Sequence, residues 1–231
     1  MREIIFDTET TGFDPQSGDR MVEIGCIEMV DRVETGNNFH CYYNPQRPMP
    51  KSAEEVHGLS DVFLSDKMLF ADGADDLLEF LGDANLVAHN AQFDFNFLNA
   101  ELRLCGCREI SQFRMIDTLA IAKVKHPGAK LSLDALCSRY GIDRSHRVKH
   151  GALLDAELLT QLYIELTGGR QIGLGLADDK ASSSDRESVS PDRKRENRQF
   201  IPPRPHHASA EELARHSAFL EDIKDPLWAK M

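Results

Sequence analysis

Short apolar segments alternate with turn residues over the first two-thirds of the chain. Five of these segments fit buried strands, expected at residues 2–8, 21–30, 38–44, 86–89 and 113–117, with a turn around residues 34–36. The spacing of apolar residues predicts helices at residues 52–57, 71–81, 92–104, 118–123, 133–140 and 151–166. An antiparallel start followed by alternating strands and helices predicts an α/β fold, with a mixed β-sheet flanked by helices.

The pattern ends near Gly168. Residues 177–199 contain no large apolar side chain except Val189, so this segment cannot bury enough surface to order itself and is expected to be a flexible linker. Beyond it, a short helix is expected from Ser209 to about Asp222, with Ser209 and Glu212 as a capping box. We therefore divide the chain into a domain at 1–167, a linker segment at 168–199 and a tail at 200–231.

Composition narrows the class of protein. The 231 residues are 41% hydrophobic, which suffices for an ordinary core, and no apolar run approaches the length of a membrane helix. The N-terminus does not resemble a signal peptide. The five cysteines are scattered, so a reduced, cytoplasmic protein that does not enter a membrane is the simplest interpretation.

Charge is distributed unevenly. The net charge is −11, and residues 1–100 carry 6 basic and 19 acidic side chains, whereas residues 101–150 carry 10 basic and 5 acidic ones. Phosphate binding depends on Lys and Arg, so an acidic protein is not by itself a DNA clamp. If it handles nucleic acid, metals or a partner must help.

Asp7 and Glu9 stand at the end of the first expected strand. Side chains alternate along a strand, so both carboxylates point to one face, where they repel each other unless a cation lies between them. A solvated strand end with two surface acids is an equally good interpretation of this pair alone.

Asp94 lies in the first turn of the helix expected at 92–104. It lies beside an apolar stripe formed by Phe93, Phe97, Ala100 and Leu104. Taken alone, Asp94 is better explained as a first-turn acid that favours the helix dipole.

His150 and Asp155 flank the start of the last helix of the domain. Asp155 aligns with the inward stripe of Leu158, Leu159, Leu162 and Leu166, and no Lys or Arg lies between residues 151 and 167 to pair with it. A buried carboxylate needs a partner, so a metal ion is favoured over a backbone hydrogen bond. His150 belongs to the preceding loop.

Together these side chains predict a metal-dependent nuclease. Carboxylate ligands select Mg²⁺ or Mn²⁺, and two such ions hydrolyse phosphodiesters in known enzymes. His150 suits the general base, because histidine is the residue type that exchanges a proton most readily near neutral pH.

The order of these residues resembles the DEDDh family of 3′–5′ exonucleases, and within it the proofreading epsilon subunits of bacterial DNA polymerase III. The supporting stretches are 7–12, 36–40, 56–58, 132–137 and 150–156, spread over nearly all of residues 1–167. The resemblance implies a ribonuclease H-like fold and removal of mispaired 3′ nucleotides from DNA as 5′-monophosphates.

The resemblance also implies roles for single residues. Asp7, Glu9 and Asp155 are expected to ligate one of two Mg²⁺ or Mn²⁺ ions, Asp7 and Asp94 the other, and His150 to deprotonate the attacking water. His57, with Ser52 nearby, is expected to contact the terminal nucleotide, together with Asp7, Glu9 and Asp155. Further expected lining groups are Thr8, Thr10, Asn90 and Phe93.

Two segments beyond residue 167, one in the linker segment and one in the tail, suggest partners. Gln171, Leu174 and Leu176 resemble a weak sliding-clamp motif, in which an extended peptide docks into a preformed groove. The segment from Ala210 to Trp228 resembles the tail that binds the polymerase III alpha subunit, although it could instead fold back on its own domain. A tether of this kind raises the local concentration of the enzyme at the DNA 3′ end. The basic side chains between Lys123 and Lys149 fit a DNA path or a solvated surface equally well.

Two rival functions stay open. One is a free-standing nuclease that trims RNA or single strands, which the tail disfavours. The other is a non-catalytic scaffold that bridges clamp and polymerase. The complete set of Asp7, Glu9, Asp94, His150 and Asp155 argues against it, because a scaffold does not require these polar side chains together. The expected location is the bacterial cytoplasm, at the nucleoid-associated replisome.

Overall fold

A computed structural model describes residues 1–145, 147, 149–168 and 207–221. The chain divides into a unit at Met1–Leu176 and a unit at Ala177–Met231. The expected linker and Gln171, Leu174, Leu176 and Trp228 lie outside the described residues, so the expectations about them stay predictions.

The first unit is built on a five-stranded sheet with the order β3-β2-β1-β4-β5. Its strands are β1 (Arg2–Thr10), β2 (Met21–Val30), β3 (Val33–Tyr42), β4 (Asn85–Ala88) and β5 (Met115–Asp117). The strands β1, β4 and β5 run parallel, whereas β2 pairs antiparallel with both β1 and β3. The expected mixed sheet is confirmed. The carboxyl ends of its three parallel strands share one edge.

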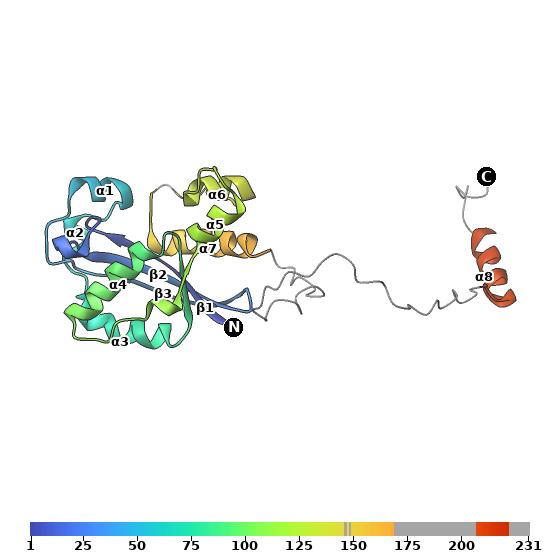
Figure 1. Cartoon of the computed structure of the whole chain (residues 1–231), viewed down its shortest axis with the longest axis horizontal. Helices are drawn as coiled ribbons and strands as arrows, with labels where there is room; N and C mark the ends of the chain where they lie inside the picture. Colours follow the sequence, from blue (N-terminus) through green and yellow to red (C-terminus); the bar gives the residue numbers. More distant parts are fainter. Residues whose placement is uncertain (146, 148, 169–206, 222–231) are drawn as a thin grey trace, which may run out of the picture. The chain divides into compact units, whose positions relative to one another are not determined.

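Helices cover both faces of the sheet. They are α1 (Lys51–His57), α2 (Asp61–Leu64), α3 (Phe70–Leu81), α4 (Gln92–Leu104), α5 (Thr118–Lys125), α6 (Leu133–Tyr140) and α7 (Ala152–Leu166), with short 3₁₀ turns η1 (Pro15–Ser17) and η2 (Gln112–Arg114). Figure 1 shows α3 and α4 on one side of the sheet and α5, α6 and α7 on the other.

The alternation of β1 divides its side chains between two cores. Ile4 and Phe6 pack with α3 and α4, whereas Ile5 packs with α5, α6 and α7. Side chains continue to alternate between the two faces up to the end of the strand. Thr8 therefore faces the α4 side, and Asp7 and Glu9 face the α7 side.

The expected position of β3 was wrong. The strand begins at Val33 because Asp31 and Arg32 form a two-residue turn, with φ of 51° and 67°. Residues 34–36, expected as the turn, lie inside the strand instead. Gly36 has φ of 87° there, near a shift of register between β2 and β3. A bulge with glycine in the left-handed region resembles a turn in sequence.

The remaining elements differ from expectation mainly at their ends. The ranges of β2, α4 and α6 match the expected ones, whereas β1 continues two residues further, to Thr10. Ser60 caps the short helix α2, which was not expected.

The second unit contains the expected helix α8 (Ala210–Glu221). Its capping box is confirmed, because Oγ of Ser209 accepts from the Glu212 N–H at 3.2 Å and Glu212 accepts from the Ser209 N–H at 2.8 Å. Leu213 and Phe219 are 55% and 62% exposed. None of the helices within the described ranges is long and apolar enough to cross a membrane.

Candidate active site

Strand β1 carries two acidic side chains to the α7 face of the sheet. Asp7 lies opposite Gly25 of β2, and Glu9 lies opposite Glu23. Glu9 and Glu23 are 8% and 3% exposed, and His40 of β3 lies 2.7 Å from the Glu23 carboxylate. The first strand therefore contributes two carboxylates to a site that is already crowded with negative charge.

Gly25 allows helix α7 to approach these carboxylates. A Cβ at Gly25 would lie 2.3 Å from the backbone nitrogen of Leu153 and 2.4 Å from its Cα, far inside van der Waals contact. The first turn of α7 thus rests directly on the backbone of β2. One turn inside the helix, Asp155 is 3% exposed and projects toward Asp7 and Glu9.

Asp94 reaches the cluster from the other face. It lies in the first turn of α4, shortly after the end of β4, and is 3% exposed. Thr8, between Asp7 and Glu9, donates a 2.7 Å hydrogen bond from its Oγ1 to Oδ1 of Asp94. Because side chains alternate along β1, Asp7 and Glu9 lie on the α7 face while Thr8, on the α4 face, holds the Asp94 carboxylate.

His150 and Arg147 close the site from the loop before α7. One ligand atom each of Glu9, His150 and Asp155 lies within 4.8 Å of the other two. The backbone N–H of His150 donates to the Val56 carbonyl at 3.3 Å, which ties this loop to α1. Arg147 donates to both oxygens of Asp155, at 2.5 Å and 2.6 Å.

The carboxylates are held at an electrostatic cost. Burial, and then the charges of Asp94, Glu9 and Asp155, raise the pKa of Asp7 well above its usual value. Burial, followed by Asp155 and Glu23, raises the pKa of Glu9 to about 8. Burial raises the pKa of Asp94 to about 7, although its hydrogen bond from Thr8 acts in the opposite direction.

This donor set fits hard divalent cations. Oxygen ligands from carboxylates suit Mg²⁺ and Mn²⁺, and a cation placed among mutually repelling buried carboxylates relieves their repulsion. A zinc site would favour histidine and cysteine ligands.

A pocket of about 160 Å³ opens beside the carboxylates. Its lining includes Glu9 of β1, Ser52 and His57 of α1, and Phe93 of α4. His57 is 6% exposed; its Nδ1 accepts from the Leu59 N–H at 3.0 Å, and its Nε2 completes no hydrogen bond of normal geometry among the described residues, although the ring interacts with the Thr10 backbone. Burial lowers the pKa of His57, so the ring is neutral and Nε2 carries the proton. A buried donor whose hydrogen bonding is incomplete suits an edge of a ligand site.

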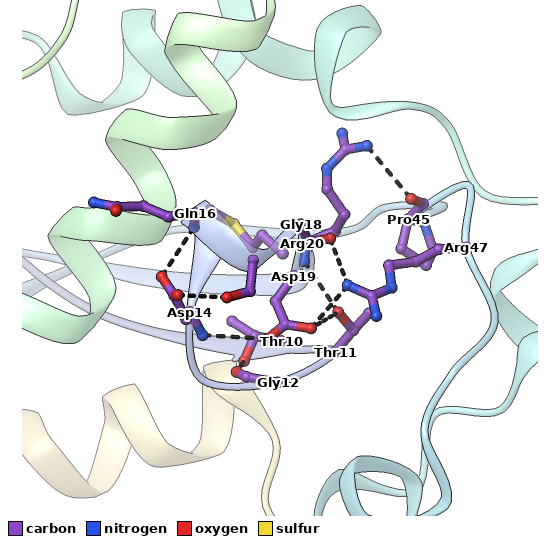
Figure 2. A network of polar contacts seen from close by, with 12 residues as sticks. Thr10, Thr11, Gly12, Asp14, Gln16, Gly18, Asp19, Arg20, Pro45 and Arg47 are labelled. Carbon is purple, nitrogen blue, oxygen red and sulfur yellow. Dashed lines mark hydrogen bonds and ion pairs between the residues drawn. The ribbon is translucent and has the colours of Figure 1, made fainter.

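The loop after β1 forms another wall of this pocket, and a polar network fixes it (Figure 2). Asp19 accepts from Thr11 Oγ1 at 3.2 Å and from Arg47 at 2.8 Å. A Cβ at Gly12 would lie 2.2 Å from the Asp19 carboxylate, so a larger residue there would have to displace that carboxylate from its partners. Arg20, the next residue, makes a two-pronged pair with Glu101 of α4, with both distances 2.8 Å.

The structure brings together Asp7, Glu9, Asp94, His150 and Asp155 at one edge of the sheet, and places Ser52 and His57 in the adjoining pocket. Asn90 does not line that pocket; it has φ of 64°, and its N–H donates to Asp117 at 3.0 Å. Of the basic stretch, Arg144, Arg147 and Lys149 line a hollow of about 320 Å³ with His150.

Two sequence expectations at the site were wrong. Asp155 does have a basic partner, because Arg147 lies just outside the helical window in which a partner was sought. The stripe on α4 was also misplaced. Leu104 is 69% exposed, and Asp94 lies within the buried face, together with Phe95 and Leu98.

Sequence reasoning missed three supporting residues. These are Gly25, Arg147 as a partner of Asp155, and Asp117, which caps α5 and holds the turn after β4. A glycine within the apolar run of β2 was the available signal, because glycine inside a strand marks a close approach of another backbone.

Comparisons with known proteins agree with this geometry. The exonuclease family model RNase_T matches residues 4–163. DNA polymerase III subunit epsilon of Rickettsia felis is 48% identical over 226 residues, which is 96% of this chain and 97% of the relative. That of Salmonella typhimurium is 42% identical over 231 residues, or 96% and 93% of the two chains. The chain belongs to the epsilon-subunit family of DNA polymerase III.

The family is one of exonucleases, and metal binding is expected for it. Among solved structures, the nuclease domain of 3′hExo, a DEDDh family member bound to rAMP, superimposes with a TM-score of 0.63. It is 16% identical and covers 72% of this chain and 91% of its own, so it establishes the fold alone. The ribonuclease H-like fold is thereby confirmed, and this chain is an exonuclease.

Proposed function

We propose that this exonuclease removes mispaired nucleotides from the 3′ end of DNA, releases them as nucleoside 5′-monophosphates, and proofreads for the replicative polymerase III. One observation carries the proposal. Four buried or half-buried carboxylates from β1, α4 and α7 converge with His150 at one edge of the sheet. The relatives are named as subunits of DNA polymerase III, which supports the choice of polymerase and of DNA as the substrate.

The carboxylates are the ligands of two divalent cations in this proposal, either Mg²⁺ or Mn²⁺. Asp7, Glu9 and Asp155 hold one ion, and Asp7 with Asp94 holds the other. When bound, the ions supply the positive charge that activates the attacking water and stabilises the leaving oxygen.

His150 is the general base. Its side chain is 47% exposed and lies beside the carboxylates on a loop tied to α1 through Val56, so it reaches both solvent and the cluster. Nη2 of Arg147 lies 2.7 Å from Nδ1 of His150, and Oδ2 of Asp155 lies 3.2 Å from the same nitrogen, so the ring is oriented by both neighbours. A neutral imidazole beside the site is able to take a proton from the attacking water.

The pocket beside Glu9 receives the terminal nucleotide. The Nε2–H of His57 offers a hydrogen bond to a substrate oxygen, and Phe93 offers an aromatic surface to the sugar or base. Ser52 lines the same wall. The hollow lined by Arg144 and Lys149 offers positive charge to the DNA backbone.

Degradation of a 5′-labelled primer with a 3′ mispair, in Mg²⁺, tests this function. The full-length protein is expected to shorten the primer stepwise, whereas Asp7→Ala and His150→Ala lose most activity. Asp14→Asn is the matched control, because Asp14 is an exposed carboxylate outside the cluster. Equal inertness of all four proteins, with polymerase binding intact, supports a scaffold instead. Faster degradation of RNA than of the mispaired primer supports the trimming nuclease.

The linker segment and the tail supply the partner contacts in this proposal. We place the polymerase III alpha subunit on the C-terminal tail that contains α8, and weak sliding-clamp binding on Gln171, Leu174 and Leu176. An acidic enzyme then acts at the DNA end because it is tethered there, in the bacterial cytoplasm at the replisome. Co-purification with each partner tests the two contacts separately.

A further inference from the structure

The guanidinium of Arg147 lies inside the carboxylate cluster. Its Nε donates to Oδ1 of Asp155 at 2.5 Å, and its Nη2 donates to Oδ2 at 2.6 Å. The side chains of Arg147 and Asp155 are only 8% and 4% exposed. A two-pronged pair of this kind, shielded from water, satisfies both oxygens of the carboxylate and fixes its orientation.

This placement competes with a divalent cation. The ligand atoms of Glu9, His150 and Asp155 are close enough to share one ion. Nη2 of Arg147 lies 2.6 Å from Asp155 and 2.7 Å from Nδ1 of His150, so it fills the space between two of these three residues. A metal ion and the guanidinium also repel each other, and burial strengthens that repulsion.

A second carboxylate lies ready to keep Arg147 paired. Nη1 of Arg147 donates to Oδ1 of Asp134 on α6 at 2.9 Å. Asp134 is 45% exposed and also pairs with Arg144 at 2.9 Å. The guanidinium can therefore leave Asp155 without losing its negative partner. That route avoids the cost of a buried, unpaired charge.

We propose that Arg147 is the internal counter-ion of the metal-free site, and that a divalent cation binds by displacing it from Asp155 while Asp134 retains the guanidinium. This inference rests on the proposed metal-dependent function. Arg147 is then a positioning residue. It holds Asp155 and His150 in place before the cation arrives, and it sets the concentration at which the site fills.

Calorimetric titration of the full-length protein with Mn²⁺ tests the competition. Arg147→Gln removes the competitor and is expected to lower the dissociation constant for Mn²⁺ by about tenfold, which corresponds to about 1.4 kcal/mol. Arg144→Gln is the matched control, because it removes the same charge and the same Asp134 partner but no contact with Asp155. It is expected to change the constant by less than about threefold.

An unchanged or weakened affinity of Arg147→Gln for Mn²⁺, with Arg144→Gln like the wild type, overturns the proposal. Arg147 would then support the ligands of the ion rather than compete with it.

The wild-type protein provides a test that does not depend on how the variant folds. The ¹⁵N resonance of the Arg147 Nε–H, assigned by its absence from the spectrum of Arg147→Lys, is followed as Mg²⁺ is added. It is expected to begin shifted and slow to exchange with solvent, and to move toward the position of a free arginine as the site saturates. A resonance that stays in place while Mg²⁺ binds overturns the displacement and leaves the metal site intact. Absence of any Mg²⁺ or Mn²⁺ binding to the wild type overturns the proposed metal function as well.

Discussion

Glu9 shows at the scale of one residue why this site calls for a cation. Its carboxyl lies opposite Glu23, and burial, followed by the charges of Asp155 and Glu23, raises its pKa to about 8. At neutral pH such a group is mostly protonated. A cation that binds the ionised form must therefore displace a proton, and metal affinity is expected to rise with pH.

The stability of the metal-free protein follows from the same shift. A carboxyl whose folded pKa exceeds its ordinary value of 4.5 binds its proton more tightly when folded. Its stabilising contribution is complete below about pH 4.5 and is lost as the pH rises through about 8. In chelator, the melting temperature of the wild type is expected to fall between about pH 5 and pH 8 more steeply than that of Glu9→Gln. Asp14→Asn, outside the cluster, should follow the wild type, and three parallel profiles would contradict the assignment.

Thr8 tunes a second carboxylate. Its hydroxyl donates to Asp94 at 2.7 Å and opposes the effect of burial, which still raises the pKa of Asp94 to about 7. Thr8→Val keeps the shape and removes the donor, so the pKa of Asp94 rises further. The acid limb of the kcat/KM profile is expected to move up by about one pH unit, with about tenfold lower activity on that limb. Thr8→Ser should restore the profile; loss of activity at every pH in both variants would indicate a packing defect instead.

At the scale of elements, the placement of α7 depends on a glycine in the neighbouring strand. A Cβ at Gly25 would overlap the backbone of Leu153, so Gly25→Ala must push the first turn of α7 away from Asp7. We expect a loss of about 1–3 kcal/mol in the free energy of unfolding and weaker Mn²⁺ binding, measured by denaturation and calorimetry.

Gly151→Ala is the matched control for this substitution. Gly151 precedes α7, and a Cβ there meets no atom within 4 Å. It should leave both measurements close to those of the wild type. Equal effects of the two substitutions would show that helix placement is not the cause.

Periodicity predicted most elements, because strands and helices whose buried faces repeat regularly are visible in sequence. It failed at β3, where the left-handed turn is made by Asp31 and Arg32 without glycine, while Gly36 forms a bulge. It also missed α2, which has only four residues. The turn, the bulge and the short helix depend on backbone conformation, which cannot be predicted from their residue types.

The candidate site was visible for a different reason. Asp7, Glu9, Asp94 and Asp155 stand at the ends of predictable elements, where topology brings them to one edge of the sheet. The contacts of Arg147 were not visible, because a flexible side chain from a loop chooses among several carboxylates only in three dimensions. Gly25 gave a signal of close approach but did not say which backbone approaches.

At the scale of the whole molecule, catalysis and tethering are assigned to different units of the chain. The four carboxylates of the candidate active site lie in the first unit. Helix α8 of the second unit carries the exposed side chains Leu213 and Phe219. Leu213→Glu and Phe219→Glu are expected to abolish capture of the polymerase III alpha subunit while leaving degradation of a free primer unchanged. Arg215→Glu, which changes charge but removes no apolar contact, should still capture it.

Equal losses of primer degradation in these variants would contradict the division of roles. If Leu213→Glu and Phe219→Glu both still capture the alpha subunit fully, the polymerase contact does not lie on α8.

The central claim is that four carboxylates of the first unit form one divalent metal centre. The most direct measurement is anomalous diffraction from crystals of the protein soaked in Mn²⁺ and a nucleoside 5′-monophosphate. The account predicts two manganese peaks among Asp7, Glu9, Asp94 and Asp155, with the nucleotide beside His57 and Arg147 released from Asp155. Manganese bound elsewhere, or carboxylates that stay free of metal at saturating Mn²⁺, would contradict it.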